Sequence, residues 1–250
     1  MAHFLWTQKQ DIGPTARTYA AMAFDVARGR TVLFGGSTSS GYMADTWEWD
    51  GTEWTQLADV GPETRWRAAV AFDSKRGRVV LFGGNGGSQG VVFFGDTWAW
   101  NGNEWTQEQD SGPSKRVTNI LAYDTIRDRV VLFGGNYNQN LSNDTWEYDA
   151  TQWTRVSDTG PSPRSGQRMV YDGANVLLFG GSGSESLFGD TWGWDGKHWT
   201  QLQDIGPTPR MDFGMAYDTL RKRTILFGGE GNRSYFGDTW EWFDHSLARP

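Results

Sequence analysis

A motif that recurs five times constrains this chain more than any other feature. Each copy has two consecutive glycines after a short apolar run, and an Asp-Thr-Trp sequence follows a short way on. The glycine pairs begin at Gly35, Gly83, Gly134, Gly180 and Gly228, and the Asp-Thr-Trp sequences begin at Asp45, Asp96, Asp144, Asp190 and Asp238. Successive glycine pairs are separated by 48, 51, 46 and 48 residues. A nearly fixed period of this length indicates an array in which each repeat is one structural unit.

The first repeat predicts four short strands and no helix. Residues 11–17 contain glycine and proline and are expected to form a loop. Apolar or alternating runs predict strands, which we call A to D, at residues 18–25, 30–34, 46–49 and 53–56. Asp50-Gly51 indicates a two-residue hairpin between strands C and D. No segment of the chain has a helical period of useful length, so an all-β fold is expected.

One four-stranded sheet of this size cannot bury both of its faces. Five such sheets arranged radially can, because each packs on its neighbours, which predicts a five-bladed β-propeller of four-stranded antiparallel blades. The repeats run without a linker, so residues 1–250 are expected to form a single domain. The repeats span approximately residues 9–56, 57–107, 108–155, 156–201 and 202–243.

The two ends of the chain suggest how the ring closes. Trp-Thr pairs, which mark strand D, begin at Trp6, Trp54, Trp105, Trp153 and Trp199. The chain therefore opens with a strand D and ends with a strand C. We expect residues 4–8 to complete the last blade as its outer strand, which removes an open sheet edge. The alternative is a fragment that assembles with another chain.

Composition limits the chemistry. The net charge of −7 argues against nucleic acid and anionic membranes as partners. Without cysteine there is no disulfide, thiolate metal site or cysteine nucleophile. The three histidines, His3, His198 and His245, fall at the termini and in a C–D turn, so a histidine base is not expected. We expect no metal and no cofactor, because no spacing fits a zinc, calcium or phosphate site.

No signal peptide is expected, because residues 1–6 lack a basic segment followed by an apolar run, and no apolar run approaches the roughly 20 residues that span a membrane. A soluble monomer is expected, with the cytoplasm as the default location.

The motif set resembles the kelch repeat over nearly the whole chain. A glycine pair follows an apolar strand, a tryptophan lies downstream, and a Pro-x-x-Arg sequence such as Pro14 to Arg17 precedes each repeat. The chain departs from the pattern at the short A–B turn of residues 173–175 and after Phe243, where no Trp-Thr strand follows. The resemblance implies that strand A lines a central channel. It also implies that the D–A and B–C loops share the face on which ligands usually bind.

Residues that recur in every repeat are interpreted as scaffold. Fourteen of the 15 tryptophans occupy repeat positions and are expected to pack between blades, and Trp66 is the exception. Five arginines match the five repeated aspartates in number, which predicts structural hydrogen-bonded pairs. These arginines are Arg17, Arg65, Arg116, Arg164 and Arg210. The alternative is a ring of arginines that binds an anion.

Residues that vary between repeats are interpreted as a site. Strand A is irregular at its start and uniform at its end, and the B–C loops carry unmatched aromatic residues. Charged side chains stand at strand A positions that other repeats fill with Thr, Gly, Ala or Ile. The candidate ligand-binding residues are Tyr19, Trp66, Arg67, Asn119, Gln167, Arg168, Asp212 and Phe213 in strand A, and Tyr42, Phe94, Tyr137 and Tyr235 in the loops. The plainer interpretation is that the loops drift, the aromatic residues plug the channel, and Asp212 neutralises an arginine.

These residues suit recognition of a small polar organic molecule or glycan at the channel mouth. The two arginines, Arg67 and Arg168, would orient this ligand, and Trp66 or Phe213 would stack on it. One alternative is an enzyme of isomerase, lyase or cyclase type with Asp212 or Tyr19 as proton carrier. The other is a scaffold that binds a protein or peptide. Convergence of Asp212 with Arg67 in a deep pocket would favour the enzyme, and an open aromatic face would favour the protein partner.

Overall fold

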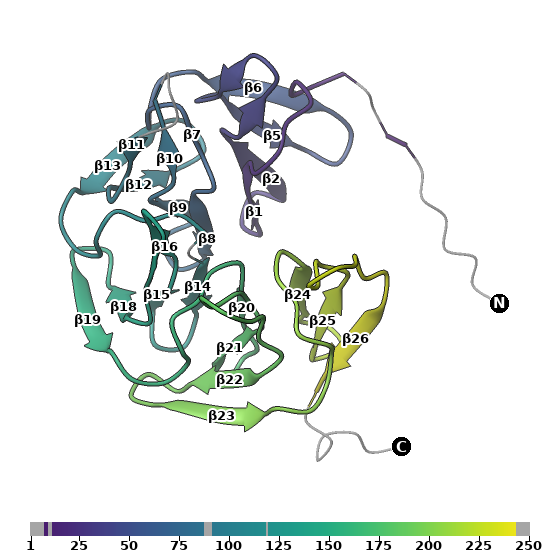
Figure 1. The fold of residues 1–250 in the computed structure, drawn as a ribbon. Helices are drawn as coiled ribbons and strands as arrows, with labels where there is room; N and C mark the ends of the chain where they lie inside the picture. Colours follow the sequence, from purple (N-terminus) through teal and green to yellow (C-terminus); the bar gives the residue numbers. More distant parts are fainter. Residues whose placement is uncertain (1–7, 10–11, 88–91, 119, 244–250) are drawn as a thin grey trace.

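The predicted all-β fold is confirmed. The computed structural model describes residues 8–9, 12–87, 92–118 and 120–243, and these form strands and turns without a helix. The described sheets are antiparallel, and in each blade the strands pair in the order A, B, C, D. Figure 1 shows the blades arranged around a common centre, with the A strands innermost and the D strands at the periphery. The fold is therefore a β-propeller.

Within the described residues four blades have all four strands, A to D, and the last has strands A to C. Blade 1 contains β1 (Ala21–Asp25), β2 (Arg30–Phe34), β5 (Thr46–Trp49) and β6 (Trp54–Ala58). Blade 2 contains β8 (Ala69–Asp73), β9 (Arg78–Phe82), β12 (Thr97–Trp100) and β13 (Trp105–Gln109). Blade 3 contains β14 (Ile120–Asp124), β15 (Arg129–Phe133), β18 (Thr145–Tyr148) and β19 (Trp153–Ser157). Blade 4 contains β20 (Arg168–Tyr171), β21 (Val176–Phe179), β22 (Thr191–Trp194) and β23 (Trp199–Gln203). Blade 5 contains β24 (Gly214–Asp218), β25 (Arg223–Phe227) and β26 (Thr239–Trp242).

Two details of the predicted strands are wrong. Strand A of blade 1 begins at Ala21 rather than residue 18, because the backbone turns sharply at Tyr19, where φ is 54°. The C–D connection is a four-residue loop rather than a two-residue hairpin. The Asp50 carboxylate accepts hydrogen bonds from the backbone N–H groups of Thr52 and Glu53, and this closes the longer loop.

The B–C loops are short hairpins that pair with the chain entering the blade. Three contain strand pairs: β3 (Ser37–Thr38) with β4 (Gly41–Tyr42), β10 (Asn85–Gly86) with β11 (Val92–Phe93), and β16 (Asn136–Tyr137) with β17 (Asn140–Leu141). In blade 2 the entering segment is itself a short strand, β7 (Arg65–Trp66), which pairs with β10. The D–A and B–C loops therefore form one continuous surface, which we call the loop face.

The glycine pairs are required where neighbouring blades approach most closely. The Gly36 N–H donates to the Arg65 carbonyl of the next blade at 2.9 Å, and Arg65 N–H donates to the Met43 carbonyl. A Cβ atom on Gly35 would lie 2.5 Å from the Arg65 carbonyl oxygen, and Gly35 has a φ of +66°. No other residue fits there without moving the backbone. The same hydrogen bond joins Gly84 to Arg116, Gly135 to Arg164 and Gly181 to Arg210.

Aromatic side chains on the outer strands join blades by packing and by hydrogen bonds. Trp105 packs edge-on against Phe34 of the preceding blade, and its Nε1–H donates to Thr46 Oγ1 at 2.8 Å. Trp153 bonds Thr97, and Trp199 bonds Thr145, in the same way. Trp100 is fully buried, and its Nε1–H donates to Glu48 of the preceding blade. The predicted packing of tryptophans between blades therefore holds for these columns.

The tryptophans that follow each Asp-Thr pair are buried less deeply, although Trp98, Trp146 and Trp192 also pack against core clusters that span two blades. Trp98 is only half-buried, and its Nε1–H donates to Asp96 of its own blade. Trp47, Trp146, Trp192 and Trp240 make the same bond to the aspartate two residues earlier.

The boundary between blades 5 and 1 differs from the other four. Phe227 is 56% exposed, whereas its counterparts in the other blades are at most 4% exposed. These counterparts are Phe34, Phe82, Phe133 and Phe179. Met22 and Phe24 of blade 1 are also exposed. Residues 4–7 of the predicted closing strand lie outside the described residues, and Gln8 is exposed and not in a strand. Closure of a five-bladed ring by the N-terminus therefore stays a prediction.

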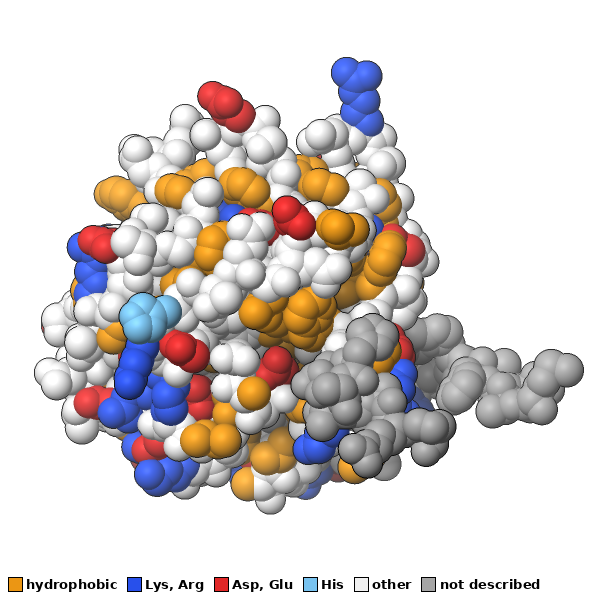
Figure 2. All heavy atoms as spheres, turned by 90° about the horizontal axis from the view of Figure 1, so that it is seen from below, with side chains coloured by type: hydrophobic (Ala, Val, Ile, Leu, Met, Phe, Trp, Pro, Cys, Tyr) orange, Lys and Arg blue, Asp and Glu red, His pale blue; other side chains and the backbone are white. Residues whose placement is uncertain are grey.

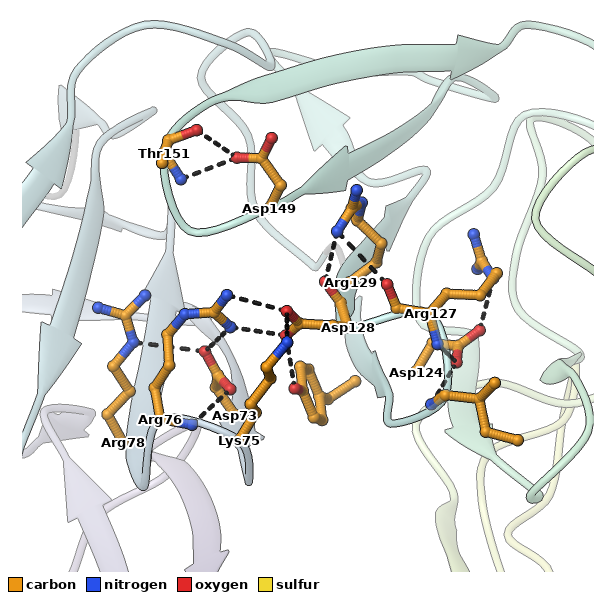
Figure 3. Close-up of polar contacts among 12 residues, drawn as sticks. Asp73, Lys75, Arg76, Arg78, Asp124, Arg127, Asp128, Arg129, Asp149 and Thr151 are labelled. Atoms are coloured by element: carbon orange, nitrogen blue, oxygen red, sulfur yellow. Dashed lines mark hydrogen bonds and ion pairs between the residues drawn. The ribbon is translucent and has the colours of Figure 1, made fainter.

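Charge is distributed unevenly between the two faces. The A–B turns carry clustered arginines and carboxylates, including Arg76, Arg127 and Asp128 (Figure 3). The B–C loops carry three charged residues, Glu185, Glu230 and Arg233. In a side view most charged side chains lie in the lower half of the molecule (Figure 2). Within the described residues no helix is long and apolar enough to cross a membrane.

Candidate functional site

The five repeated arginines are bound within the scaffold. Arg65 Nη1 lies 2.6 Å from Asp96 Oδ1, its Nη2 donates to Oδ2, and two further N–H groups, on Nη1 and Nε, donate to the carbonyls of Gly83 and Glu63. The equivalent ion pairs are Arg17–Asp45, Arg116–Asp144, Arg164–Asp190 and Arg210–Asp238. Each arginine thus joins its own blade through its side chain and, from Arg65 onward, the preceding blade through its backbone. The donors that an anion would need are already occupied.

These ion pairs also lower the pKa values of the carboxyl groups of the aspartates. Burial alone would raise the pKa of the Asp96 carboxyl, but the hydrogen bonds and charge of Arg65 outweigh burial and hold this pKa below its ordinary value. The pKa values of Asp45, Asp144 and Asp190 are also lowered, because the hydrogen bonds and charges of their arginines outweigh the effect of burial.

The start of each strand A contains an elbow in the left-handed backbone conformation. The five elbow residues are Tyr19, Arg67, Thr118, Gly166 and Asp212, with φ between 51° and 70°. At this point the backbone leaves the loop face and enters the inner strand, so the elbow side chains lie where the loop face meets the channel. Three of the five were candidate site residues from the sequence.

Four candidate residues form one cluster on blades 1 and 2. The Trp66 ring stacks on Tyr42, with centroids 5.8 Å apart and planes 7° from parallel, and Tyr19 packs against it at 5.2 Å. The Arg67 guanidinium carbon lies 4.3 Å from the centroid of Tyr19 and 4.4 Å from that of Trp66. Cation–π contacts of this length hold a guanidinium in one plane. We call Tyr19, Tyr42, Trp66 and Arg67 the aromatic–arginine cluster.

The polar atoms of this cluster lack protein partners. Arg67 forms no ion pair within the described part of the chain, and its Nε atom is buried without a hydrogen-bond partner there. Trp66 Nε1 is buried and unpartnered in the same sense. Buried N–H groups usually find an acceptor, so these two unsatisfied donors are unusual for a pure scaffold.

Arg168 and Asp212 form a second group on blades 4 and 5. Burial lowers the pKa of the Arg168 guanidinium, and the negative charge of the Asp212 carboxylate partly opposes this effect. Asp212 also lies beside Gly166, to whose carbonyl its backbone N–H donates. The contacts of Asp212 are therefore on blade 4, while those of Arg67 are on blades 1 and 2. The convergence of Asp212 with Arg67 that would favour an enzyme is absent from these contacts.

Two further candidate residues are buried between neighbouring blades. Gln167 is fully buried, and its Nε2–H donates to the Phe133 carbonyl of the preceding blade at 3.0 Å. Phe213 is 1% exposed and packs edge-on against Phe179 of the preceding blade. In the described conformation Phe213 therefore offers no face on which a ligand could stack. Asn119, the equivalent candidate in blade 3, lies outside the described residues.

The aromatic residues of the B–C loops form two groups, one buried against the scaffold arginines and one exposed on the surface. Phe94 is buried beneath Arg65, whose guanidinium carbon lies 3.9 Å from the ring centroid, and Phe188 and Phe236 cover Arg164 and Arg210 similarly. The recurring Phe-Gly-Asp sequence in these three repeats signals this role, and comparing the loops between repeats would have detected it. Tyr137, packed against Phe93, is 45% exposed, and Tyr235 is 83% exposed. These two belong to the surface.

A groove of about 660 Å³ lies on the loop face between blades 3 and 4. Its lining is mainly hydroxyl and amide side chains, with one carboxylate, Glu185. The polar uncharged residues are Asn136, Gln139, Asn140, Ser162, Ser165, Ser182, Ser184 and Ser186. Sequence reasoning missed this groove, because it is formed by two hairpins brought together only by the packing of the blades. The described residues contain no group of three His, Asp or Glu placed to hold a metal ion.

Comparison with known families agrees with the fold and its repeats. A propeller of blades that each carry a glycine pair, an arginine–aspartate lock and a following tryptophan is a kelch-type propeller. A family model described as the KLHDC2/KLHL20/DRC7 Kelch-repeats domain matches residues 99–245, which is more than half of the chain. The chain therefore belongs to the kelch-repeat family. No curated protein was found to match the sequence. Kelch domains generally bind protein partners, and the fold is that of a protein-binding or ligand-binding module.

Proposed function

We propose that this chain is a recognition module that binds a peptide segment of a partner protein on its loop face. An acidic side chain of that segment would be seated at Arg67. The observation that carries the proposal is the aromatic–arginine cluster, in which the Arg67 guanidinium lies over two rings, has an unpartnered Nε–H and has no carboxylate partner among the described residues. A guanidinium held in this way is suited to planar, bidentate recognition of a carboxylate.

The surroundings of Arg67 support a peptide over a reaction. Tyr, Trp and Arg are the residues that contribute most at protein interfaces, and the loop face exposes Tyr19, Tyr137 and Tyr235. The B–C loops carry few charges, so the unpaired Arg67 would dominate the local field. Catalysis by Asp212 and Tyr19 is less well supported, since Asp212 contacts Gly166 of blade 4 while Tyr19 packs on Trp66 and beneath Arg67.

The test uses selection from a random-sequence peptide library displayed on phage, followed by titration of the recovered peptide. Arg67→Ala should weaken binding by about tenfold or more, a loss typical of a central interface arginine. Arg67→Lys should recover only part of the affinity, because lysine keeps the charge but not the planar stacking. Arg155→Ala is the matched control, since Arg155 is an exposed arginine on the outer strand β19.

Replacing the acidic residue of the recovered peptide by its amide should lose as much affinity as Arg67→Ala. The two changes together should lose little more than either one, because they remove the same contact. Recovery of peptides without an acidic residue, or equal binding by the Arg67→Ala variant, would contradict the assignment of Arg67.

A second candidate, a neutral glycan, is favoured by the groove between blades 3 and 4. Its hydroxyl and amide lining can donate to and accept from sugar hydroxyl groups, and it contains a single charge. A glycan array probed with the intact chain tests this candidate. Binding that is lost on Asn140→Ala and kept on Arg67→Ala would assign the glycan to the groove. Loss on Arg67→Ala alone would assign it elsewhere.

A further inference from the structure

The left-handed elbows are a requirement of the fold, but the side chains on them are not. The Arg67 N–H donates to the Tyr19 carbonyl of the preceding blade at 3.1 Å, and Asp212 N–H donates to the Gly166 carbonyl at 3.0 Å. These bonds join neighbouring blades at the channel mouth. Gly166 adopts the same conformation with a φ of 70° and has no side chain, so the elbow itself needs only a backbone.

Side chains at such positions are unfavourable. In the left-handed conformation Cβ crowds the backbone, and glycine avoids this strain. Asparagine and aspartate tolerate the conformation, whereas tyrosine, arginine and especially the β-branched threonine do so poorly. The chain nevertheless places Tyr19, Arg67 and Thr118 at elbows, together with Asp212.

At most other left-handed positions this chain uses glycine, and Ala150 and Lys222 are among the exceptions. All ten residues of the five glycine pairs are glycine. On the opposite face, the left-handed position of the A–B turn is Gly29 in blade 1 and Gly77 in blade 2. Asp128 takes that position in blade 3, where its carboxylate is bound by Arg76, Lys75 and Tyr123.

Within the described residues no ion pair holds an elbow side chain, and Tyr19 and Arg67 contact each other and Trp66 on the loop face. Tyr19 is half exposed, Asp212 is exposed, and Arg67 forms no ion pair within the described residues. The Thr118 hydroxyl donates only to the carbonyl of the residue before it. Strained residues that the fold does not require are concentrated at functional sites.

We infer that the elbow residues are the specificity-determining positions of the loop face, kept as Tyr19, Arg67, Thr118 and Asp212 because a bound segment contacts them. This inference rests on the proposed peptide-binding function. It extends the site from the single aromatic–arginine cluster to the residues where four blades meet the channel mouth, with a cation at Arg67 and an anion at Asp212. A ligand bearing both signs of charge fits this arrangement.

The experiment compares glycine substitutions at the elbows with one on the opposite face. Tyr19→Gly, Arg67→Gly, Thr118→Gly and Asp212→Gly are made singly and together. Lys222→Gly is the control, because Lys222 is exposed in the left-handed position of the last A–B turn, with a φ of 56°. Thermal unfolding is measured for each variant, together with its affinity for the peptide recovered from the displayed library by the unmodified chain.

Thr118→Gly and Lys222→Gly should leave the melting temperature unchanged or raise it by about 2–4 °C, since each relieves a strained position. Each elbow variant should weaken peptide binding, and the combined variant should lose it by about a hundredfold or more, whereas Lys222→Gly should bind like the unmodified chain.

The outcomes separate the inference from the function on which it rests. A further variant combines Tyr19→Gly, Thr118→Gly and Asp212→Gly and keeps Arg67. If the peptide binds this variant as tightly as the unmodified chain, the elbow assignment is overturned and the proposed peptide binding at Arg67 stands. A fall in melting temperature on Thr118→Gly larger than on Lys222→Gly overturns the premise that the fold does not need the side chain. If the unmodified chain recovers no peptide, the proposed function fails, and the elbow assignment fails with it.

Discussion

Arg76 and Asp128 join the A–B turns of two neighbouring blades through a two-pronged ion pair. Arg76 Nη1 lies 2.6 Å from Asp128 Oδ1, and Nη2 lies 3.0 Å from Oδ2 (Figure 3). Lys75 and the Tyr123 hydroxyl also donate to this carboxylate, at 2.8 Å each. The network is specific to blades 2 and 3, because the blade 1 and 2 turns have glycine at the position of Asp128.

Asp128→Ala should be less stable than Asp128→Gly. Both changes remove the ion pair, which at a partly exposed site contributes up to about 1 kcal/mol. Alanine also keeps a Cβ atom in the left-handed conformation, where glycine is favoured by a further 1 kcal/mol or so. Urea unfolding of the two variants measures the difference. Equal stability would mean that the turn is not strained.

The Arg76–Asp128 network also predicts a contribution to folding stability that is lost at acidic pH. Hydrogen bonds from Arg76, assisted by Lys75 and Tyr123, lower the pKa of the Asp128 carboxyl well below its ordinary value. A carboxyl whose pKa is lowered by folding stabilises the protein above the unfolded value of about 4, and this contribution is lost as the pH falls below it. The stability difference between the unmodified chain and Asp128→Asn should therefore shrink between about pH 5 and pH 2. A difference that is constant over this range would contradict the expectation.

Breaking one arginine–aspartate lock should be strongly destabilising. Asp96→Ala leaves the guanidinium of Arg65, which is 1% exposed, without its carboxylate, and a broken buried pair typically costs about 3–5 kcal/mol. Asp158→Ala is the control, since Asp158 and Arg155 form an exposed pair at 3.6 Å that should contribute less than about 1 kcal/mol. Chemical denaturation compares the two. If Asp96→Ala and Asp158→Ala lose similar amounts of unfolding free energy, the buried Arg65–Asp96 pair contributes no more to stability than an exposed pair.

Trp100→Ala should cost more stability than Trp66→Ala. Trp100 is fully buried between blades and donates to Glu48, so its removal leaves a cavity and should cost about 3–5 kcal/mol. Trp66 is half-buried on the loop face, and its indole N–H has no partner among the described residues to lose. Guanidinium unfolding gives both values. The reverse order would contradict the division of tryptophans into scaffold and site.

The repeat predicts a specific contact for ring closure. Trp105, Trp153 and Trp199 donate to Thr46, Thr97 and Thr145 of the preceding blade, so the next member of the series pairs Trp6 with Thr191. We therefore propose that residues 4–8 complete blade 5 and close residues 1–250 into one domain. Deleting residues 1–8 should expose the edge of β26 and cause aggregation or a large fall in melting temperature.

A double-mutant cycle with Trp6→Phe and Thr191→Val should show coupling, as should Trp153→Phe with Thr97→Val, which serves as the reference. A truncated chain that melts like the full one would rule out the closing strand.

Much of the scaffold could be predicted because it repeats. A left-handed turn, an apolar strand and an Asp-Thr-Trp sequence are local signals, and five copies at one period identify the blades without any knowledge of their contacts. Recurrence also matched the five arginines with the five aspartates in number, which predicted that they pair because buried charges need partners, and the structure decided which arginine pairs with which aspartate. Strand ends were less accurate. The elbow at Tyr19 depends on a hydrogen bond from the next blade, which no local pattern contains.

The candidate site was predicted only in part, because contacts between blades decide which of the variable residues are exposed. Variation between repeats indicated candidate site residues at the start of strand A, but it could not distinguish an exposed side chain from one buried between blades. Gln167 and Phe213 vary as Tyr19 and Arg67 do, yet they fill the gap beside the preceding blade. The sequence by itself determined the number of repeats and their strands, because these depend on neighbours in the chain. Only the tertiary structure decided that Arg67 lies over Tyr19 and Trp66 while Asp212 contacts Gly166, since those contacts depend on the radial packing of separate blades.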